Sequence, residues 1–294
     1  MLYQRRDFLK SAIKLSYGLV LTSISNKVTG CNVSKVNNSN VAFGLQLYTL
    51  RDDMPKNPKE VLRQVASYGY RQIESYEHKT LGIFWGMDYK EFKTYVDGLG
   101  MQLIASHCDI DKNFEQKADQ AAAIGMKYLI CPWIGPQKSL DDYKRAADKF
   151  NNRGEICKKA GLKFAYHNHD YSFIPIENRY PQDIIMQHTD KDLVDYEMDI
   201  YWVVTAGQNP IHWLNKYPDR FKLSHIKDRK KSVSASEKNA STILGTGQID
   251  FAKVLKIARK NGMNYFIVEQ ELYEHTTPLA AIERNAEYMK QLKP

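Results

Sequence analysis

FAYHNHD (164–170), DYEMDIYW (195–202), FKLSHIKD (221–228) and YFIVEQE (265–271) are four short apolar segments, each of which ends in residues that can bind a metal. Segments with a helical pattern lie between them. Short apolar runs without polar alternation are typical of strands in a parallel sheet that is covered on both faces. If the four segments are successive strands of a parallel barrel, their last residues meet at its carboxyl-terminal end, where the active sites of such barrels lie.

The same alternation begins at residue 41 and predicts eight strands, at 41–47, 71–76, 102–107, 128–132, 163–169, 194–199, 221–226 and 265–269. Helices are predicted at 57–68, 88–99, 113–124, 140–160, 181–187, 210–216, 250–261 and 278–292. Eight such units over about 250 residues match one (β/α)8 barrel. We therefore predict an α/β fold, a single TIM barrel over residues 41–294. A doubly wound sheet is the alternative, but no Gly-x-Gly-x-x-Gly follows the first strand, which is evidence against a dinucleotide site.

The composition fits a large globular domain and gives no sign of a nucleic-acid partner. The 294 residues are 43% hydrophobic and carry a formal charge of +8. Residues 1–31 hold five Lys or Arg and one Asp, so they supply +4 and the remaining residues +4. This modest excess is spread along the chain, whereas a nucleic-acid site concentrates it in a basic patch. We therefore expect a small-molecule partner and no nucleic acid.

The amino terminus is predicted to be an address and not part of the fold. QRRDFLK (4–10) resembles a twin-arginine export signal, and VTGC (28–31) resembles the cleavage box of a bacterial lipoprotein. We expect residues 1–31 to direct export of the protein. The exported protein would be either free in the periplasm or a membrane-anchored lipoprotein, in which a lipid on Cys31 is the only membrane contact. The polar residues 32–40 would then form a tether. A basic leader with a chance cysteine is the alternative.

The ends of the four quoted segments supply the candidate metal ligands His167, Asp199, His225 and Glu269. Two imidazoles and two carboxylates at one end of a barrel favour a single divalent cation bound through nitrogen and oxygen. His169 has the same strand parity as His167 and is the alternative ligand from that strand. Taken alone, each residue is more often a hydrogen-bonded histidine or a solvated carboxylate. Their common position at consecutive strand ends carries the prediction.

Several motifs together resemble the xylose isomerase-like barrels of the sugar phosphate isomerase/epimerase family: GLQLYTLRD (44–52), HNHD, DIYW, HIKD, GTGQIDF (245–251) and VEQE. The resemblance covers residues 41–292 and implies one divalent metal ion, commonly manganese, zinc or cobalt. Asp199, His225 and Glu269 match the family's ligand positions. Many relatives have a glutamate where this chain has His167, so the predicted site carries one negative charge fewer, which favours zinc-like ions.

Other residues at the predicted mouth are candidates for acid–base chemistry and substrate binding. The catalytic candidates are His169, His107, Glu74 and Lys227. Glu74 and His107 are proposed as acid and base or as contacts to sugar hydroxyls, and Lys227 as a partner of an enolate oxygen or of Asp228. The predicted substrate contacts are Trp202, Trp133, Trp85 and Asp228. Burial of the tryptophans without any ligand is the alternative.

The resemblance implies isomerisation or epimerisation of a sugar or sugar derivative through a metal-stabilised enediolate. Expulsion of a β-substituent at the same site would instead make the enzyme a lyase or hydratase on a keto-sugar or keto-glycoside. The predicted export and the lack of a glycine-rich phosphate loop favour a carbohydrate without phosphate. A noncatalytic carbohydrate-binding lipoprotein is the alternative from another class, because the usual glutamate is missing. The oligomeric state is not predicted.

Overall fold

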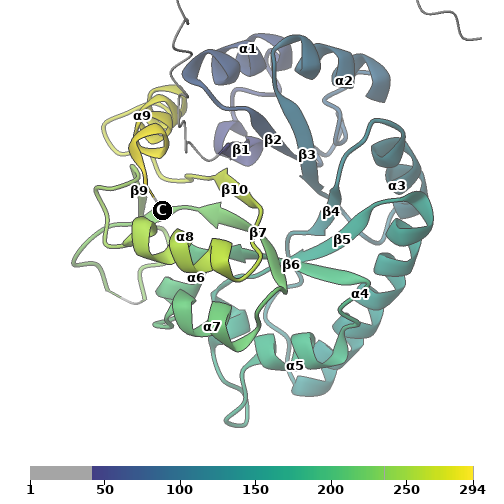
Figure 1. The fold of residues 1–294 in the computed structure, drawn as a ribbon, viewed down its shortest axis with the longest axis vertical. Helices are drawn as coiled ribbons and strands as arrows, with labels where there is room; N and C mark the ends of the chain where they lie inside the picture. The colour runs from purple at the N-terminus through teal and green to yellow at the C-terminus, as the bar shows by residue number, and fades with distance from the viewer. Residues whose placement is uncertain (1–41, 235, 294) are drawn as a thin grey trace, which may run out of the picture. The chain divides into compact units, whose positions relative to one another are not determined.

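Eight parallel strands close into a barrel in the computed structural model, which describes residues 42–234 and 236–293 (Figure 1). The strands follow one another around the barrel in chain order: β1 (Gly44–Gln46), β2 (Gln72–Tyr76), β3 (Gln102–His107), β4 (Tyr128–Cys131), β5 (Lys163–His167), β6 (Val194–Asp199), β7 (Phe221–Ile226) and β10 (Tyr265–Val268). The predicted TIM barrel is therefore confirmed. The predicted export signal, the acylation site Cys31 and the tether lie outside the described residues.

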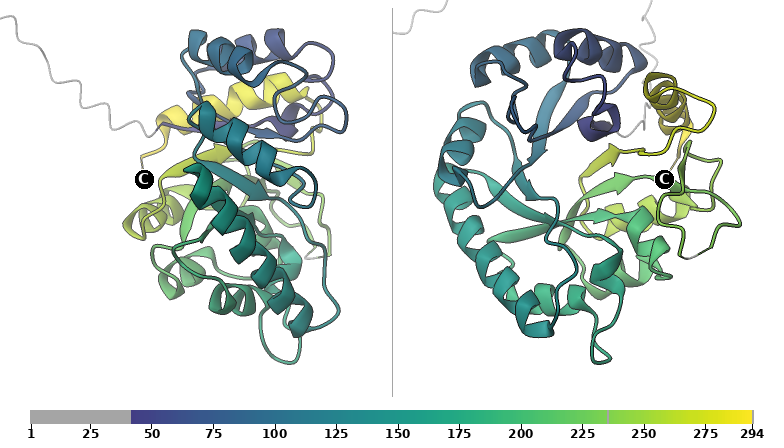
Figure 2. Two further views of the ribbon diagram at one scale, coloured as in Figure 1. Left: turned by 90° about the vertical axis from the view of Figure 1, so that its right-hand side faces the viewer. Right: turned by 180° about the vertical axis from the view of Figure 1, so that it is seen from behind.

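Helices surround the barrel on the outside, as the two further views show (Figure 2). They are α1 (Pro58–Tyr68), α2 (Tyr89–Gly98), α3 (Phe114–Ala123), α4 (Leu140–Ala160), α5 (Pro181–His188), α6 (Ile200–Thr205), α7 (Pro210–Lys216), α8 (Phe251–Lys260) and α9 (Pro278–Gln291). Two 3-10 helices, Leu47–Leu50 and Asp170–Phe173, and a short hairpin of β8 (Asp228–Arg229) with β9 (Ser241–Thr242) complete the set. Among the described residues, no helix is long and apolar enough to span a membrane.

Local sequence signals explain where the helices begin and end. At the start of α4, Ser139 and Asp142 form a capping box, in which each side chain accepts a hydrogen bond from the backbone of the other residue. The same helix ends at Gly161, whose φ of +89° is a left-handed conformation that glycine adopts without steric cost. Among the α-helices of the described residues, α6 alone was not predicted. It begins directly after β6, because the Asp199 side chain accepts a hydrogen bond from the Trp202 backbone N–H at 3.1 Å.

Side chains alternate along each strand between the helices and the barrel axis. On β6, Val194, Tyr196 and Met198 belong to the large core under the helices. Asp195, Glu197 and Asp199 occupy the other parity and therefore face the axis. The amino-terminal part of the barrel interior is filled by a separate apolar cluster of Ile104, Ala105, Tyr128, Ile130, Ala165 and Leu223. The barrel interior is thus filled by apolar side chains at its amino-terminal end and lined by polar side chains at its carboxyl-terminal end.

Candidate active site

The predicted ligands Asp199, His225 and Glu269 come together at the carboxyl-terminal end of the barrel. Each offers one ligand atom, and these atoms lie within 4.8 Å of one another. His225 Nδ1 is 3.2 Å from Glu269 Oε2 and 3.9 Å from Asp199 Oδ2. His167 adds its Nε2 atom at 3.7 Å from Asp199 Oδ2. All four residues are buried, and we call them the upper cluster.

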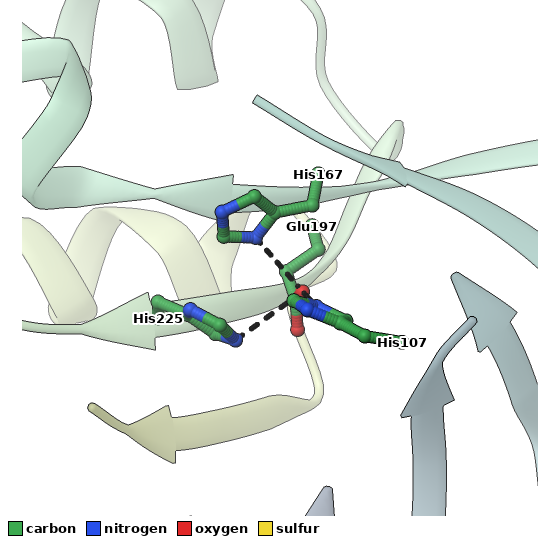
Figure 3. Close-up of side chains that lie close together, drawn as sticks. All are labelled: His107, His167, Glu197 and His225. Atoms are coloured by element: carbon green, nitrogen blue, oxygen red, sulfur yellow. Dashed lines mark hydrogen bonds and ion pairs between the residues drawn. The ribbon is translucent and has the colours of Figure 1, made fainter. Parts of the chain in front are cut away.

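A second group of titratable side chains shares two of these residues, and Figure 3 shows four of its members, His107, His167, Glu197 and His225. In this lower cluster, Glu197 Oε2 lies 2.8 Å from His107 Nε2, 3.0 Å from His167 Nδ1 and 3.3 Å from His225 Nε2. Glu74 Oε1 lies 2.7 Å from His225 Nε2 and accepts a hydrogen bond from the Gln46 amide at 2.6 Å. His167 and His225 therefore turn one ring nitrogen toward each cluster.

Both groups contain side chains that could hold a metal ion, but their distances differ. Ligand atoms placed tetrahedrally at about 2.1 Å from an ion are roughly 3.4 Å apart. Three nitrogen–oxygen separations in the upper cluster, 3.2, 3.7 and 3.9 Å, suit this arrangement. The shortest separations in the lower cluster, 2.7 to 3.0 Å, are instead those of direct hydrogen bonds. Asp199 Oδ2 is buried without a hydrogen-bond partner, which a cation would supply.

The upper cluster could therefore hold a divalent metal through His167, Asp199, His225 and Glu269. The lower carboxylates then accept hydrogen bonds from the opposite ring nitrogens, Glu197 from His167 and Glu74 from His225. Such outer contacts fix the tautomer and orientation of a metal-binding histidine. His169, the alternative ligand, faces the cavity, and its Nδ1 atom has no hydrogen-bond partner.

The buried acids of the two clusters carry unfavourable negative charge. Burial raises the pKa of Asp199 to about 7, and Glu269 adds to the rise while Lys227 and His225 oppose it. Burial and the neighbouring Glu74 raise the pKa of Glu197, also to about 7. A cation beside Asp199 would stabilise its ionised form and lower this pKa. The raised pKa of Asp199, the nitrogen and oxygen ligand atoms around it and its unpartnered Oδ2 atom therefore all favour a bound cation.

Two histidines at the cavity have opposite protonation states at neutral pH. Burial lowers the pKa of His107, but Glu74 and Glu197 raise it more, and the net value is about 9. Burial lowers the pKa of His169 to about 3, and the Lys227 charge contributes to the fall. His107 is therefore an imidazolium that can donate a proton, whereas His169 is a neutral imidazole that can accept one.

A cavity of about 540 Å³ opens at this end of the barrel, which is an ordinary size for a small-molecule site. Its walls include six residues predicted from the sequence: His107, His167, His169, Trp133, Trp202 and Glu269. Lys227 lies behind this wall. It forms ion pairs with Glu269 at 3.2 Å and with Glu271, and its ammonium group lies over the rings of Tyr201 and Trp202. The alternative pairing of Lys227 with Asp228 is not observed.

The structure places two predicted substrate contacts away from this cavity. Trp85 is buried, and its indole N–H donates a hydrogen bond to Ser75 Oγ at 3.0 Å. Asp228 is buried, and its carboxylate accepts hydrogen bonds from the backbone N–H groups of Gly245 and Gly247, each at 2.9 Å. A Cβ atom on Gly247 would overlap that carboxylate. Neither residue is among those that line the cavity: Trp85 supports the rim, and Asp228 organises the turn before α8.

Sequence reasoning missed Glu197, the residue at the centre of the lower cluster. Asp195, Glu197 and Asp199 alternate along β6 and so share one face of the strand. The same parity that identified Asp199 could therefore have identified Glu197 two residues earlier. Tyr48 and Glu271, which also line the cavity, lie just beyond their strands, where no side-chain periodicity predicts direction.

Comparison with known proteins agrees with this geometry. Residues 62–292 match the family described as "Xylose isomerase-like TIM barrel". Inosose dehydratases of Clostridium botulinum and Clostridium perfringens are 28% and 24% identical; the matches cover 82% and 80% of this chain and 93% and 91% of those proteins. A sugar phosphate isomerase/epimerase from Parabacteroides distasonis has a similar structure, with 28% identity, a TM-score of 0.74, and coverage of 87% of this chain and 95% of that one. The chain therefore belongs to the xylose isomerase-like TIM barrel family.

Proposed function

We propose that this protein is a metal-dependent lyase that eliminates water from a keto-sugar. The observation that carries the proposal is the pair of histidines at one cavity, neutral His169 and protonated His107, beside a buried set of metal ligands. The similarity to inosose dehydratases over most of both chains supports the choice of elimination. A divalent cation at the upper cluster would act as a Lewis acid on the oxygens of the keto-sugar and make the neighbouring C–H more acidic.

Side chains of this protein would supply the base and the acid of the elimination. His169 removes the proton from the carbon next to the ketone, because its imidazole is neutral at physiological pH. His107 gives its proton to the β-hydroxyl, which leaves as water while a carbon–carbon double bond forms. Glu74 and Glu197 hold His107 in place through contacts of 3.1 and 2.8 Å. Burial of His107, Glu74 and Glu197 limits the access of bulk water to the general acid.

Epimerisation is the second candidate, and the similarity to a sugar phosphate isomerase/epimerase favours it. The same proton abstraction serves both reactions. The difference is whether a proton returns to the carbon or a β-hydroxyl departs.

Mass spectrometry in D2O separates these two functions. The purified protein, loaded in turn with Mn²⁺, Zn²⁺ and Co²⁺, is incubated with a keto-inositol and with keto-glycosides. A lyase gives a product lighter by one water, whereas an epimerase gives a product of unchanged composition that carries one deuterium on carbon. If neither elimination nor exchange occurs with any of the three metals, both functions are wrong.

Export is a separate proposal that rests on the amino-terminal motifs. We infer that residues 1–31 direct the protein out of the cytoplasm and that Cys31 receives a lipid. In a bacterial host, the full chain should fractionate with membranes and a Cys31→Ser variant should not. Recovery of both proteins from the cytoplasm would contradict the proposal.

A further inference from the structure

Two exposed aromatic side chains stand on the rim of the cavity. Among the described residues, the exposed large hydrophobic side chains are Tyr48, Trp133 and Ile174, with 40%, 53% and 49% of their surface accessible. Tyr48 and Trp133 line the same cavity, and Ile174 does not. Single exposed hydrophobic residues are ordinary on protein surfaces, but two aromatic rings on one rim indicate a surface that a ligand covers.

The structure holds both rings in fixed positions. Trp133 packs edge to face against His169 and Tyr171, with centroid distances of 4.5 and 4.8 Å. Tyr48 packs in the same way against Tyr76 at 5.2 Å. The Arg51 guanidinium lies over the Tyr48 ring at 5.0 Å. Rings held in this way lose little conformational entropy when a ligand covers them, so they are prepared for binding.

The support of Tyr48 extends to the buried Trp85. Tyr76 packs edge to face against Trp85 at 4.9 Å, and Trp85 is anchored through its indole N–H to Ser75. A buried tryptophan therefore supports a half-buried tyrosine, which in turn supports an exposed one. This arrangement explains how Tyr48 remains ordered at the rim with much of its surface in water.

The rim rings are much more exposed than the candidate metal ligands that line the same cavity. His107, His167 and Glu269 line the cavity and are buried, His169 is partly exposed, and Trp133, which contacts His169, is more than half exposed. A single sugar ring bound at the buried residues would leave the rim aromatics in water. A ligand that also covers Trp133 must extend outward by a further ring.

Most charged side chains that line the cavity are paired, and among the described residues Lys79 is the one lining charge without an ion pair. The acidic side chains there are paired, Asp109 with Lys112 at 3.4 Å and Glu77 with Lys117 at 2.6 Å. No arginine is among the described residues that line the cavity. Phosphate groups are usually bound by arginine forks or helix amino termini. The rim instead offers aromatic faces, which suit the apolar C–H face of a sugar ring.

We propose that the substrate has two rings: a keto-sugar ring at the upper cluster and a second, uncharged sugar ring, joined by a glycosidic bond, that stacks on Trp133 and faces the Tyr48 side of the rim. The inference rests on the proposed function and names its substrate class, a neutral keto-disaccharide in place of a keto-monosaccharide or a sugar phosphate. The reacting ring sets the chemistry, and the outer ring sets the specificity.

The kinetic test compares kcat/KM for a keto-disaccharide with that for the corresponding keto-monosaccharide. The wild-type protein should prefer the disaccharide, and Trp133→Ala should reduce this ratio by about 10–100-fold, the loss expected for one stacked ring. Trp133→Phe should restore much of the ratio. Ile174→Ala is the matched control, because it removes an exposed hydrophobic side chain outside the cavity, and it should leave the ratio unchanged. A ratio that does not change in Trp133→Ala would overturn the proposal, because Trp133 would then act only through His169.

A binding measurement separates this inference from the proposed reaction. Isothermal titration of the metal-loaded protein with an unreactive disaccharide and with its monosaccharide needs no turnover. Tighter binding of the disaccharide, lost in Trp133→Ala, would support the outer site even if no keto-sugar reacts. Equal binding of the two sugars, or no binding of either, would overturn it even if a keto-monosaccharide reacts. An aryl glycoside and a sugar phosphate complete the series, and preference for either over the disaccharide would also contradict the proposal.

Discussion

The two ends of the barrel interior differ in whether the protein satisfies its buried acids. At the amino-terminal end, Asp195 accepts a hydrogen bond from the Tyr128 hydroxyl at 3.0 Å inside an apolar cluster. At the carboxyl-terminal end, one oxygen of each of three buried acids, Glu74, Glu197 and Asp199, has no hydrogen-bond partner. Unpartnered buried charge is costly to the fold, so its concentration at one end indicates a site that awaits an external partner.

Strand β6 displays this difference within six residues. Asp195, Glu197 and Asp199 face the axis at successive depths and are all buried. The first is bonded to a tyrosine, the second to histidines through one oxygen while its other oxygen has no partner, and the third has an unpartnered oxygen beside two more potential ligands. One strand therefore passes from structural to functional polar groups, and matched substitutions along it can test the assignment.

The largest effect is expected from Asp199→Asn. Asparagine keeps the size of the side chain and its ability to cap α6, but it removes the negative charge. We expect metal content far below one equivalent and a loss of kcat/KM of about 1,000-fold or more, because the Lewis acid is lost. Elemental analysis of the folded protein gives the metal content. Asp195→Asn, the same change at the other end of β6, is the control and should retain metal. Full metal content in Asp199→Asn would refute the upper cluster as the site.

A smaller effect is expected from Glu197→Gln, which removes a charge that contacts the ligands without binding the metal itself. Outer carboxylates of this kind typically contribute about 10–100-fold to metal affinity. We expect the dissociation constant to rise by that factor in a competition titration with a coloured chelator. Activity should recover in part when excess metal is added. A loss of metal as complete as that of Asp199→Asn would show instead that the lower cluster binds the cation.

The pH dependence should reveal the proton held by His107. Its pKa is raised from the ordinary histidine range to about 9, so the imidazolium is present at neutral pH and is lost as the pH rises through 9. If His107 is the general acid, kcat/KM should fall about tenfold per pH unit above that value. The His107→Gln variant has no proton to lose, so its residual activity should lack this alkaline decline. An unchanged decline in the variant would assign it to another group.

The positions of the site residues on strands could be predicted from the sequence, whereas those of the residues in loops could not. Parity fixes the direction of a strand side chain, so the apolar runs before His167, Asp199, His225 and Glu269 were sufficient to bring these residues to one end of the barrel. Glu197 was within reach of the same reasoning. The apolar runs and their alternation with helical segments also predicted the eight strands to within a few residues.

The direction of a loop side chain depends on the local backbone conformation, which the sequence pattern does not predict. Trp85 has a φ of +59°, which is rare for a bulky residue, and this conformation accompanies its burial next to Ser75. Asp228 follows a strand, yet the glycines 17 and 19 positions later wrap their N–H groups around it. Their pairing is long-range, so neither residue could be excluded from the cavity by its position in the chain.

The smallest effects are expected on the free energy of unfolding of the metal-free protein. They should have opposite signs for substitutions at the two ends of the barrel interior. Tyr128→Phe removes the hydrogen bond to Asp195, whose pKa burial already raises, and should reduce the free energy of unfolding by about 1–3 kcal/mol. Urea denaturation in the presence of a chelator measures this quantity without a contribution from bound metal. Metal content and kcat should not change.

Asp199→Asn should have the opposite sign in the same experiment. Because the folded pKa of Asp199 is raised to about 7, its ionisation destabilises the metal-free fold as the pH rises from the unfolded value near 4 through 7. Asparagine removes that cost, so the variant should be more stable than the wild type at pH 8 and should lose the advantage at pH 4. Destabilisation at pH 8 would mean that the carboxylate is satisfied by the protein alone, and the contrast between the two ends would disappear. A gain in the free energy of unfolding would show that the Asp199 carboxylate destabilises the metal-free fold. The protein would then keep this charge because it binds a cation, and not because it stabilises the fold.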